Sequence, residues 1–175
     1  MAVLQTDLVR YVTQKTRHGW LMMAQSDVGI CFAEFAANKA AVLQKLRDSF
    51  PQSALVAENS ASHSISKSCQ AMVRYLEGTG RYPSATLDLR GTPFQKEVWH
   101  QLQKTTAHQT LSYSALAKRI GAPKAIRAVA SACAANRIAV LVPCHRALRA
   151  DGGLGGYRWG LTLKKHLLDL ERRRH

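Results

Sequence analysis

The 175-residue sequence has few cysteines, and no two of them lie at the spacing of a paired metal-binding or redox motif. The four are Cys31, Cys69, Cys133 and Cys144; no two form a Cys-x-x-Cys motif, and no histidine lies at zinc-finger spacing from them. This arrangement excludes a zinc finger and a dense disulfide framework. We therefore expect reduced thiols, no metal and no cofactor.

Long apolar runs are also missing. No stretch approaches the roughly 20 apolar residues that a membrane-spanning helix needs. The segment Met1–Asp7 has no basic residues followed by an apolar core, as a secretory signal would. These absences exclude an integral membrane protein and indicate a cytoplasmic one, which we expect to act as a monomer.

Acidic residues are scarce in the second half of the chain. Residues 1–88 carry nine Lys and Arg against seven Asp and Glu, a net charge of +2, whereas residues 89–175 carry sixteen against four, a net charge of +12. An excess of this size favours a nucleic acid partner, because neutralising phosphates releases counterions. A basic surface that is merely solvated is the alternative.

The first half of the chain has the pattern of a small α/β domain. Stretches rich in β-branched, aromatic and sulphur-containing residues predict short strands at 8–13, 20–25 and 29–35. Asn38 can cap a helix that stops before Pro51, a polar Ser-rich connection follows, and apolar spacing predicts a second helix over 65–76. We expect residues 1–83 to form a support domain with a short antiparallel sheet and helices.

Residues 84–175 read as mainly helical after a short strand at 86–89. Thr92 and Pro93 form a helix start, with Gln95 placed to close a capping box, and a last helix is expected over 162–171. The predicted fold class is therefore α/β, with the N-terminal α/β domain joined to a mainly helical C-terminal domain that contains a helix-turn-helix.

The helix-turn-helix is predicted over residues 112–136. Ser112 or Ser114 can cap a short helix, Gly121 supplies the turn, and Pro123 opens a second helix. The buried face of that second helix is expected to hold Ile126, Val129, Ala130 and Cys133.

The outward face of the second helix is composed mostly of small residues: Ala128, Ser131, Ala132 and Ala135, beside the long Arg127. Small side chains cannot reach base edges in the major groove, but they let a helix lie close to the shallower groove. We expect contact with DNA that tolerates any sequence. An alanine-rich packing helix is the alternative.

A candidate nucleophile follows the apolar run at 138–142. Pro143 ends this predicted buried strand, and Cys144, His145 and Arg146 come next. A thiolate is a strong nucleophile, and a histidine beside it can shift its ionisation. The placement favours chemistry over the alternative of a buried, inert cysteine.

The segment Pro143–Arg146 resembles the active-site signature of the DNA O6-alkylguanine alkyltransferases, although Ala147 stands where the family has valine. Further matches are Ser112-Tyr113, Pro123-Lys124-Ala125, Arg127-Ala128-Val129 and Asn136. The resemblance is strong over residues 85–171 and covers residues 1–80 only in general layout.

This resemblance implies a role for each matching residue. The helix-turn-helix would dock in the minor groove, Arg127 would fill the base stack, and Tyr113 would support the flipped nucleotide and donate a proton to it. Glu171 would orient His145, which activates Cys144 through a bound water, and Asn136 would join the second helix to the active-site strand. The resemblance also implies DNA contacts by Gln95 and Ser114, with backbone contacts at Ala122 and Ala150. The small outward residues Ala128, Ser131 and Ala132 are expected to contact DNA as well. The implied base pocket consists of Ala147, Gly156, Tyr157, Arg158 and Trp159.

The implied reaction transfers an alkyl group from O6-alkylguanine in double-stranded DNA to Cys144, once per molecule. Whether O4-alkylthymine is accepted stays open. The first alternative is a non-catalytic DNA-damage-binding or regulatory protein. A cysteine hydrolase and a piece of a larger adaptive-response protein are the others.

Overall fold

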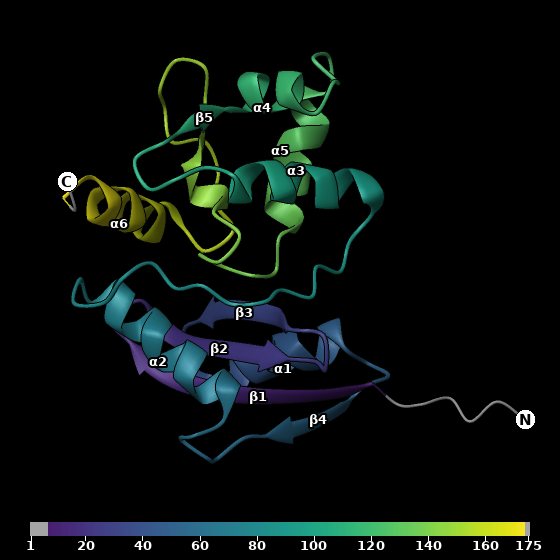
Figure 1. Ribbon diagram of the computed structural model, residues 1–175, viewed down its shortest axis with the longest axis vertical. Helices are drawn as coiled ribbons and strands as arrows, with labels where there is room; N and C mark the ends of the chain where they lie inside the picture. Colours follow the sequence, from purple (N-terminus) through teal and green to yellow (C-terminus); the bar gives the residue numbers. More distant parts are fainter. Residues whose placement is uncertain (1–6, 174–175) are drawn as a thin grey trace, which may run out of the picture. The chain divides into compact units, whose positions relative to one another are not determined.

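The computed structural model describes residues 7–173, and it divides between Leu89 and Arg90 into two compact units. The first unit holds a sheet with two helices, and the second is mainly helical (Figure 1). Together they make an α/β protein, as the sequence predicted at this level. None of the helices among the described residues has the length and apolarity needed to cross a membrane. The cytoplasmic location stays a prediction.

The sheet of the first unit has four strands in the order β3-β2-β1-β4. Strands β1 (Leu8–Thr16), β2 (Gly19–Gln25) and β3 (Ile30–Ala36) pair antiparallel, which confirms the three predicted strands. Strand β4 (Ala54–Ala57) pairs parallel with the first half of β1. The prediction of a simple Ser-rich connection was wrong here, because backbone pairing with a distant strand sets this short segment.

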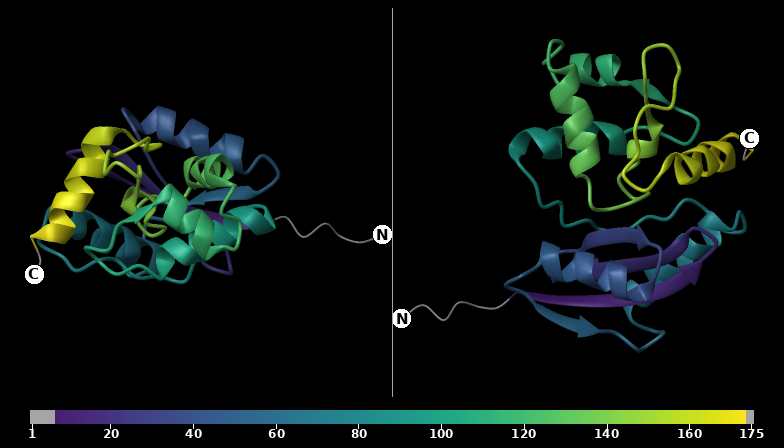
Figure 2. Two further views of the ribbon diagram at one scale, coloured as in Figure 1. Left: turned by 90° about the horizontal axis from the view of Figure 1, so that it is seen from above. Right: turned by 180° about the vertical axis from the view of Figure 1, so that it is seen from behind.

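Two helices pack on opposite faces of this sheet (Figures 1 and 2). Helix α1 (Lys39–Ser49) contacts β2 and β3, and α2 (Ser64–Leu76) contacts β1 and β2. Strand β2 is covered on both faces, so its residues 21–24 are all buried. The side chain of Asn38 accepts a hydrogen bond from the amide of Ala41, which confirms the predicted helix cap.

The segment after α2 returns to the sheet at a single point. The strand predicted at 86–89 is reduced to one bridge between Ile30 and Leu87. The amide of Ile30 donates to Thr86, and the amide of Asp88 donates to Ile30, over 2.9 Å each. This segment therefore pairs with β3 through a single bridge and does not form an additional strand.

The second unit consists of four helices and two very short strands among its described residues. Its elements are α3 (Pro93–Gln103), β5 (Leu111–Ser112), α4 (Tyr113–Arg119), α5 (Ile126–Ala135), the 3-10 turn η1 (Cys144–Arg146), β6 (Ala147–Leu148) and α6 (Leu161–Arg172). Thr92 and Gln95 form the predicted capping box at the start of α3. Helix α3 packs against α4 and α5, and α6 packs against η1.

Helix α5 begins three residues later than predicted. Pro123 lies in the turn that joins α4 to α5, and the first helical residue is Ile126. Ile126 was predicted to be buried but is 42% exposed. Of the residues predicted to be buried, Val129 and Cys133 are buried, because that part of the helix meets its packing partners.

The predicted strand over 138–142 was wrong. These residues are buried, as expected, but they form a turn in which Val140 has a φ of 69°. A β-branched residue in this left-handed region is strained, so the surrounding contacts must hold it there. Asn136 provides several of them, because its side chain binds the amide and carbonyl of Ile138 and the carbonyl of Val142.

Candidate active site

A cavity of about 1200 Å³ opens in the second unit, between α4, α5 and the glycine-rich loop that precedes α6. Its apolar lining and a few polar groups are typical of a site for a small organic ligand. It is lined by Tyr113, Ser114, Ile126, Arg127, Ala130, Cys133, Ala134, Cys144, Arg149, Ala150, Leu154, Gly155, Gly156, Tyr157, Arg158 and Leu161. Residues predicted to contact DNA and residues predicted to form the base pocket therefore line the same cavity.

Cys144 lies at the first position of η1, and its side chain lines this cavity while remaining 97% covered, with a relative exposure of 3%. The amide nitrogen Nδ2 of Asn136 lies 3.3 Å from its sulphur. Asn136 is itself buried and directly follows α5 as its C-terminal cap. The residue predicted to join α5 to the nucleophile thus contacts both.

The environment of Cys144 keeps its thiol protonated in the free protein. Burial raises its pKa well above the usual range, hydrogen bonding and charge interaction with Cys133 raise it further, and Asn136 and Lys164 oppose both effects. The thiol therefore needs a base before it can attack.

His145 and Glu171 supply that base. The Nε2 atom of His145 lies 2.9 Å from Oε1 of Glu171, and both side chains are almost fully buried. Arg146 donates to both oxygens of the same carboxylate through Nε and Nη2, at 2.8 to 3.2 Å, and its Nη1 donates to Thr105. Burial raises the pKa of Glu171, but hydrogen bonds from His145 and Arg146 outweigh it and lower the pKa to about 2.

The ionised carboxylate determines the tautomer of the histidine. A carboxylate can only accept, so Nε2 of His145 carries the hydrogen and donates to Glu171. Burial lowers the pKa of His145 despite the opposing effect of Glu171, so the ring is neutral at pH 7. Its Nδ1 atom is buried and has no hydrogen-bond partner among residues 7–173, which leaves a basic lone pair there.

Tyr113 stands at the start of α4 and lines the same cavity. Burial, reinforced by the nearby thiols of Cys133 and Cys144, raises its pKa to about 12. Its ring lies so close to Gly155 that a Cβ atom there would be 3.1 Å from the ring, and Gly155 has a φ of 65°. Only glycine fits both the conformation and the contact.

The predicted base pocket is partly present. Gly156, Tyr157 and Arg158 line the cavity, and Arg158 donates to the carbonyl of Ala134 over 3.3 Å. Trp159 is not among the described lining residues; its ring packs on Tyr157 with 5.1 Å between centroids. Ala147 is fully buried in β6 and also lies outside the lining.

Sequence reasoning missed Lys164. This lysine is completely buried on α6, and its Nζ donates to the carbonyls of Ala147, Leu154 and Gly156 and lies 6.0 Å above the ring of Tyr157. Burial lowers its pKa to about 8. Its position in an apolar helical stripe was a signal, because a lysine there must find buried acceptors.

The side chains predicted to contact DNA lie in different environments. Arg127, Ala128 and Ser131 are exposed on α5, and Ser114 lines the cavity, bonded to Ser112 over 2.8 Å. Ala132 was wrongly placed on the outer face: it is 2% exposed, and its carbonyl accepts from the Trp99 indole over 2.9 Å. The side chain of Gln95 is used in the cap of α3.

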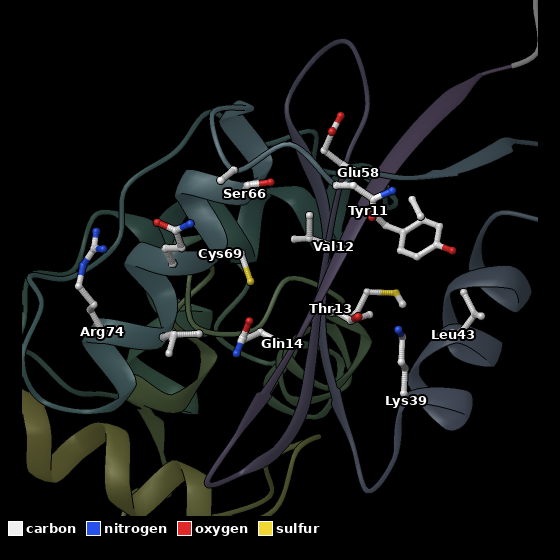
Figure 3. Close-up of a pocket in the computed structure, with 16 residues that line it drawn as sticks. Tyr11, Val12, Thr13, Gln14, Lys39, Leu43, Glu58, Ser66, Cys69 and Arg74 are labelled. Atoms are coloured by element: carbon white, nitrogen blue, oxygen red, sulfur yellow. The ribbon is translucent and has the colours of Figure 1, made fainter.

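A second cavity, of about 600 Å³, lies in the first unit beside the edge of β1 that β4 leaves uncovered (Figure 3). Its thiol, Cys69, has a pKa raised to about 11 by burial, and the labelled polar groups around it include Lys39, Glu58 and Arg74. The described lining of this cavity includes the carboxylate of Glu58 but no histidine. No group of three or more metal-ligating side chains occurs among residues 7–173.

Comparisons with known proteins agree on one family. The family described as "6-O-methylguanine DNA methyltransferase, DNA binding domain" matches residues 93–173. The bifunctional transcriptional activator/DNA repair enzyme Ada of Escherichia coli (strain K12) is 40% identical over 164 residues, which are 93% of this chain and 45% of Ada. The chain thus spans less than half the length of that relative.

Two further relatives are covered over most of their length. A probable methylated-DNA–protein-cysteine methyltransferase of Acanthamoeba polyphaga mimivirus is 41% identical over 69% of this chain and 81% of its own. The crystal structure of Mycobacterium tuberculosis OGT in complex with DNA superposes with a TM-score of 0.77 at 32% identity, over 94% of both chains. The chain therefore belongs to the family of methylated-DNA–protein-cysteine methyltransferases.

Proposed function

We propose that this protein repairs DNA by moving the alkyl group of O6-alkylguanine onto Cys144, once per molecule. One observation supports the proposal most strongly. Cys144 lines a cavity, and the next residue, His145, forms a buried pair with the carboxylate of Glu171. The named relatives support the same reaction. The thioether product has no group near it that hydrolyses such a bond, so each molecule acts once.

The reaction is a direct displacement at saturated carbon. His145 takes the thiol proton of Cys144 at Nδ1, relayed through a water molecule, while Glu171 stabilises the imidazolium that forms. The thiolate attacks the alkyl carbon, the carbon–O6 bond breaks, and its electron pair passes to the guanine. Tyr113 donates a proton to the departing base; its pKa, raised to about 12, keeps the hydroxyl protonated until the base departs.

The target carbon is shielded inside a duplex, so the nucleotide must be turned out into the cavity. We propose that α4, the turn and α5 act as a helix-turn-helix in the minor groove and that Arg127 fills the vacated stack. The exposed Ala128 and Ser131 support this proposal, because small residues allow close backbone approach. The second unit, with its net charge of +12, would bind DNA, and the first unit would support it.

A non-catalytic DNA-damage-binding protein is the alternative function. It would need the cavity and the basic surface but would have no use for a thiol beside a buried His145–Glu171 pair. Burying that pair costs free energy, so a protein that only binds would gain nothing from keeping it. The geometry therefore favours transfer.

The decisive experiment incubates the protein with duplex DNA that contains O6-methylguanine and measures the intact mass. We expect each molecule to gain one methyl group, located on Cys144 by peptide mapping. Cys144→Ser should gain none, and the matched control Cys69→Ser should react like the wild type. Unmodified wild-type protein with persistent damage would reject the transferase and leave the binding protein.

Duplex and single-stranded substrates test the role of Arg127. Arg127→Ala should slow methyl transfer from duplex DNA much more than transfer from a single strand, because only the duplex has a stack to fill. An equal loss on both substrates would contradict the stack-filling role.

A further inference from the structure

Helix α5 brings a second thiol to the reaction cavity. Cys133 lies in the last turn of α5, is 7% exposed, and lines the same cavity as Cys144. The proposed transfer reaction uses only Cys144. The second unit contains no other cysteine, so the only two thiols of residues 90–175 meet in one place.

The two thiols lie near the same groups. Cys133 is one cause of the raised pKa of the Cys144 thiol, and both thiols raise the pKa of the nearby Tyr113 hydroxyl. Asn136 fixes the arrangement, because its amide nitrogen lies 3.3 Å from the Cys144 sulphur while its backbone amide donates to the carbonyl of Cys133, also over 3.3 Å. Both cysteines are therefore anchored by Asn136 and line one cavity, which places their thiols where they can react with each other.

We infer that Cys133 and Cys144 form a redox-active dithiol that a two-electron thiol oxidant, such as a diazene or a peroxide, converts into a disulfide. With a diazene, one sulphur first adds to the nitrogen–nitrogen double bond. The second sulphur then displaces the resulting hydrazine and forms the sulphur–sulphur bond. The two thiols lose two hydrogens and two electrons, and the diazene gains them as a hydrazine.

Such a disulfide would occupy the sulphur that accepts the alkyl group, a consequence that rests on the proposed function. Oxidation would therefore stop repair, and a reducing thiol would restore it. The disulfide also protects Cys144. Without a second thiol, a peroxide would oxidise Cys144 further, to a sulfinic acid that simple thiols cannot reduce.

The remaining cysteines provide the contrast. Cys31 and Cys69 belong to the first unit, where Cys31 packs in the core formed with α1 and its thiol lies 3.6 Å from the carbonyl of Ala24. Cys69 is buried on α2, and the second cavity shows no other cysteine in its described lining. Neither residue should form a bond of this kind.

The test treats the reduced, DNA-free protein with diamide, blocks remaining thiols with iodoacetamide and digests it with trypsin. Trypsin cuts after Arg127, Arg137 and Arg146, which separates the two thiols into peptides 128–137 and 138–146. We expect these peptides to be joined, with two hydrogen atoms lost, and dithiothreitol to release them. The rate should rise about tenfold per pH unit around neutrality, because the raised pKa of Cys144 leaves little thiolate.

The variants separate the possible outcomes. Cys69→Ser should give the same joined peptides, whereas Cys133→Ser and Cys133→Ala should give none and should overoxidise at Cys144 under peroxide. Two free, alkylated peptides from oxidised wild type would overturn the inference, as would Cys144 joined to Cys31 or Cys69. Because this readout uses no DNA, failure here leaves the methyl-transfer result intact, and a failed transfer leaves this one intact.

Discussion

Glu171 is the residue on which the buried charges of the site converge. Arg146 and His145 both donate to its carboxylate, and all three side chains are at most 3% exposed. Removing one partner of such a group leaves another charge buried without compensation, which typically costs about 3–5 kcal/mol.

Glu171→Gln should therefore slow alkyl transfer and lower the free energy of unfolding at pH 7 by roughly this amount. The wild-type carboxylate has a pKa lowered from 4.5 to about 2, so its contribution is complete above pH 4.5 and declines as pH falls towards 2. By linkage this contribution is about 3 kcal/mol. Urea unfolding across this pH range should show the difference between wild type and variant narrowing on acidification.

Asp169 on the same helix is the matched control. Its side chain is partly exposed and pairs with the exposed Arg172 over 3.8 Å, so Asp169→Asn should cost less than about 1 kcal/mol. A difference between wild type and Glu171→Gln that stays constant with pH would contradict the role of the ionised carboxylate.

Lys164 holds part of the loop that lines the cavity, because its Nζ donates to the carbonyls of Leu154 and Gly156. Lys164→Met preserves the apolar stem but leaves the carbonyls of Ala147, Leu154 and Gly156 without their donor. We expect faster amide hydrogen exchange in residues 149–157 and slower methyl transfer, by about tenfold, for an effect of about 1.4 kcal/mol. Lys165→Met removes the same charge from the exposed neighbouring position and should change neither. Unchanged amide hydrogen exchange in residues 149–157 would show that Lys164 does not hold this loop in place.

At the scale of elements, α5 has one face committed to packing and one face exposed. Val129, Ala132 and Cys133 are buried, while Arg127, Ala128 and Ser131 are exposed. The hydrogen bond from Trp99 to Ala132 fixes which face turns inward.

A negative charge on the exposed face should therefore weaken DNA binding. We expect Ser131→Glu to raise the dissociation constant for duplex DNA by about tenfold, because a carboxylate would face the phosphates. Gln52→Glu adds the same charge at an exposed position of the first unit and should have little effect. Fluorescence anisotropy with an unmodified duplex measures both. Equal effects would show that net charge alone, and not α5, governs binding.

At the scale of the whole molecule, charge is divided between the two units as it is along the chain. Leu89 is neutral, so residues 90–175 keep the full net charge of +12, against +2 before them. Binding that depends on such a unit is driven by counterion release.

DNA affinity should consequently fall steeply with salt. For about six phosphate contacts, we expect a loss of roughly 10³-fold between about 50 and 200 mM salt, with a linear plot of log affinity against log salt. A flat dependence would mean that the basic excess lies away from the DNA.

Local patterns in the sequence were enough to predict the features that depend on neighbouring residues. The caps at Asn38 and Thr92 and the three strands of the hairpin region all formed as expected, because near neighbours along the chain satisfy their backbone groups. The resemblance over residues 85–171 identified the family, and it paired His145 with Glu171, whose side chains lie 2.9 Å apart.

Tertiary structure alone decided what depends on distant contacts. Strand β4 exists because the edge of β1 pairs with it, and residues 138–142 turn instead of extending because Asn136 binds their backbone. Ala132 and Ser131 are adjacent small residues, and the contact of α5 with α3, which includes the hydrogen bond from Trp99 to the Ala132 carbonyl, determines which one is buried. The shared cavity of Cys133 and Cys144 and the three acceptors of Lys164 likewise appear only in three dimensions. Periodicity records which residues are apolar, but a buried polar group is placed by partners far away in the chain.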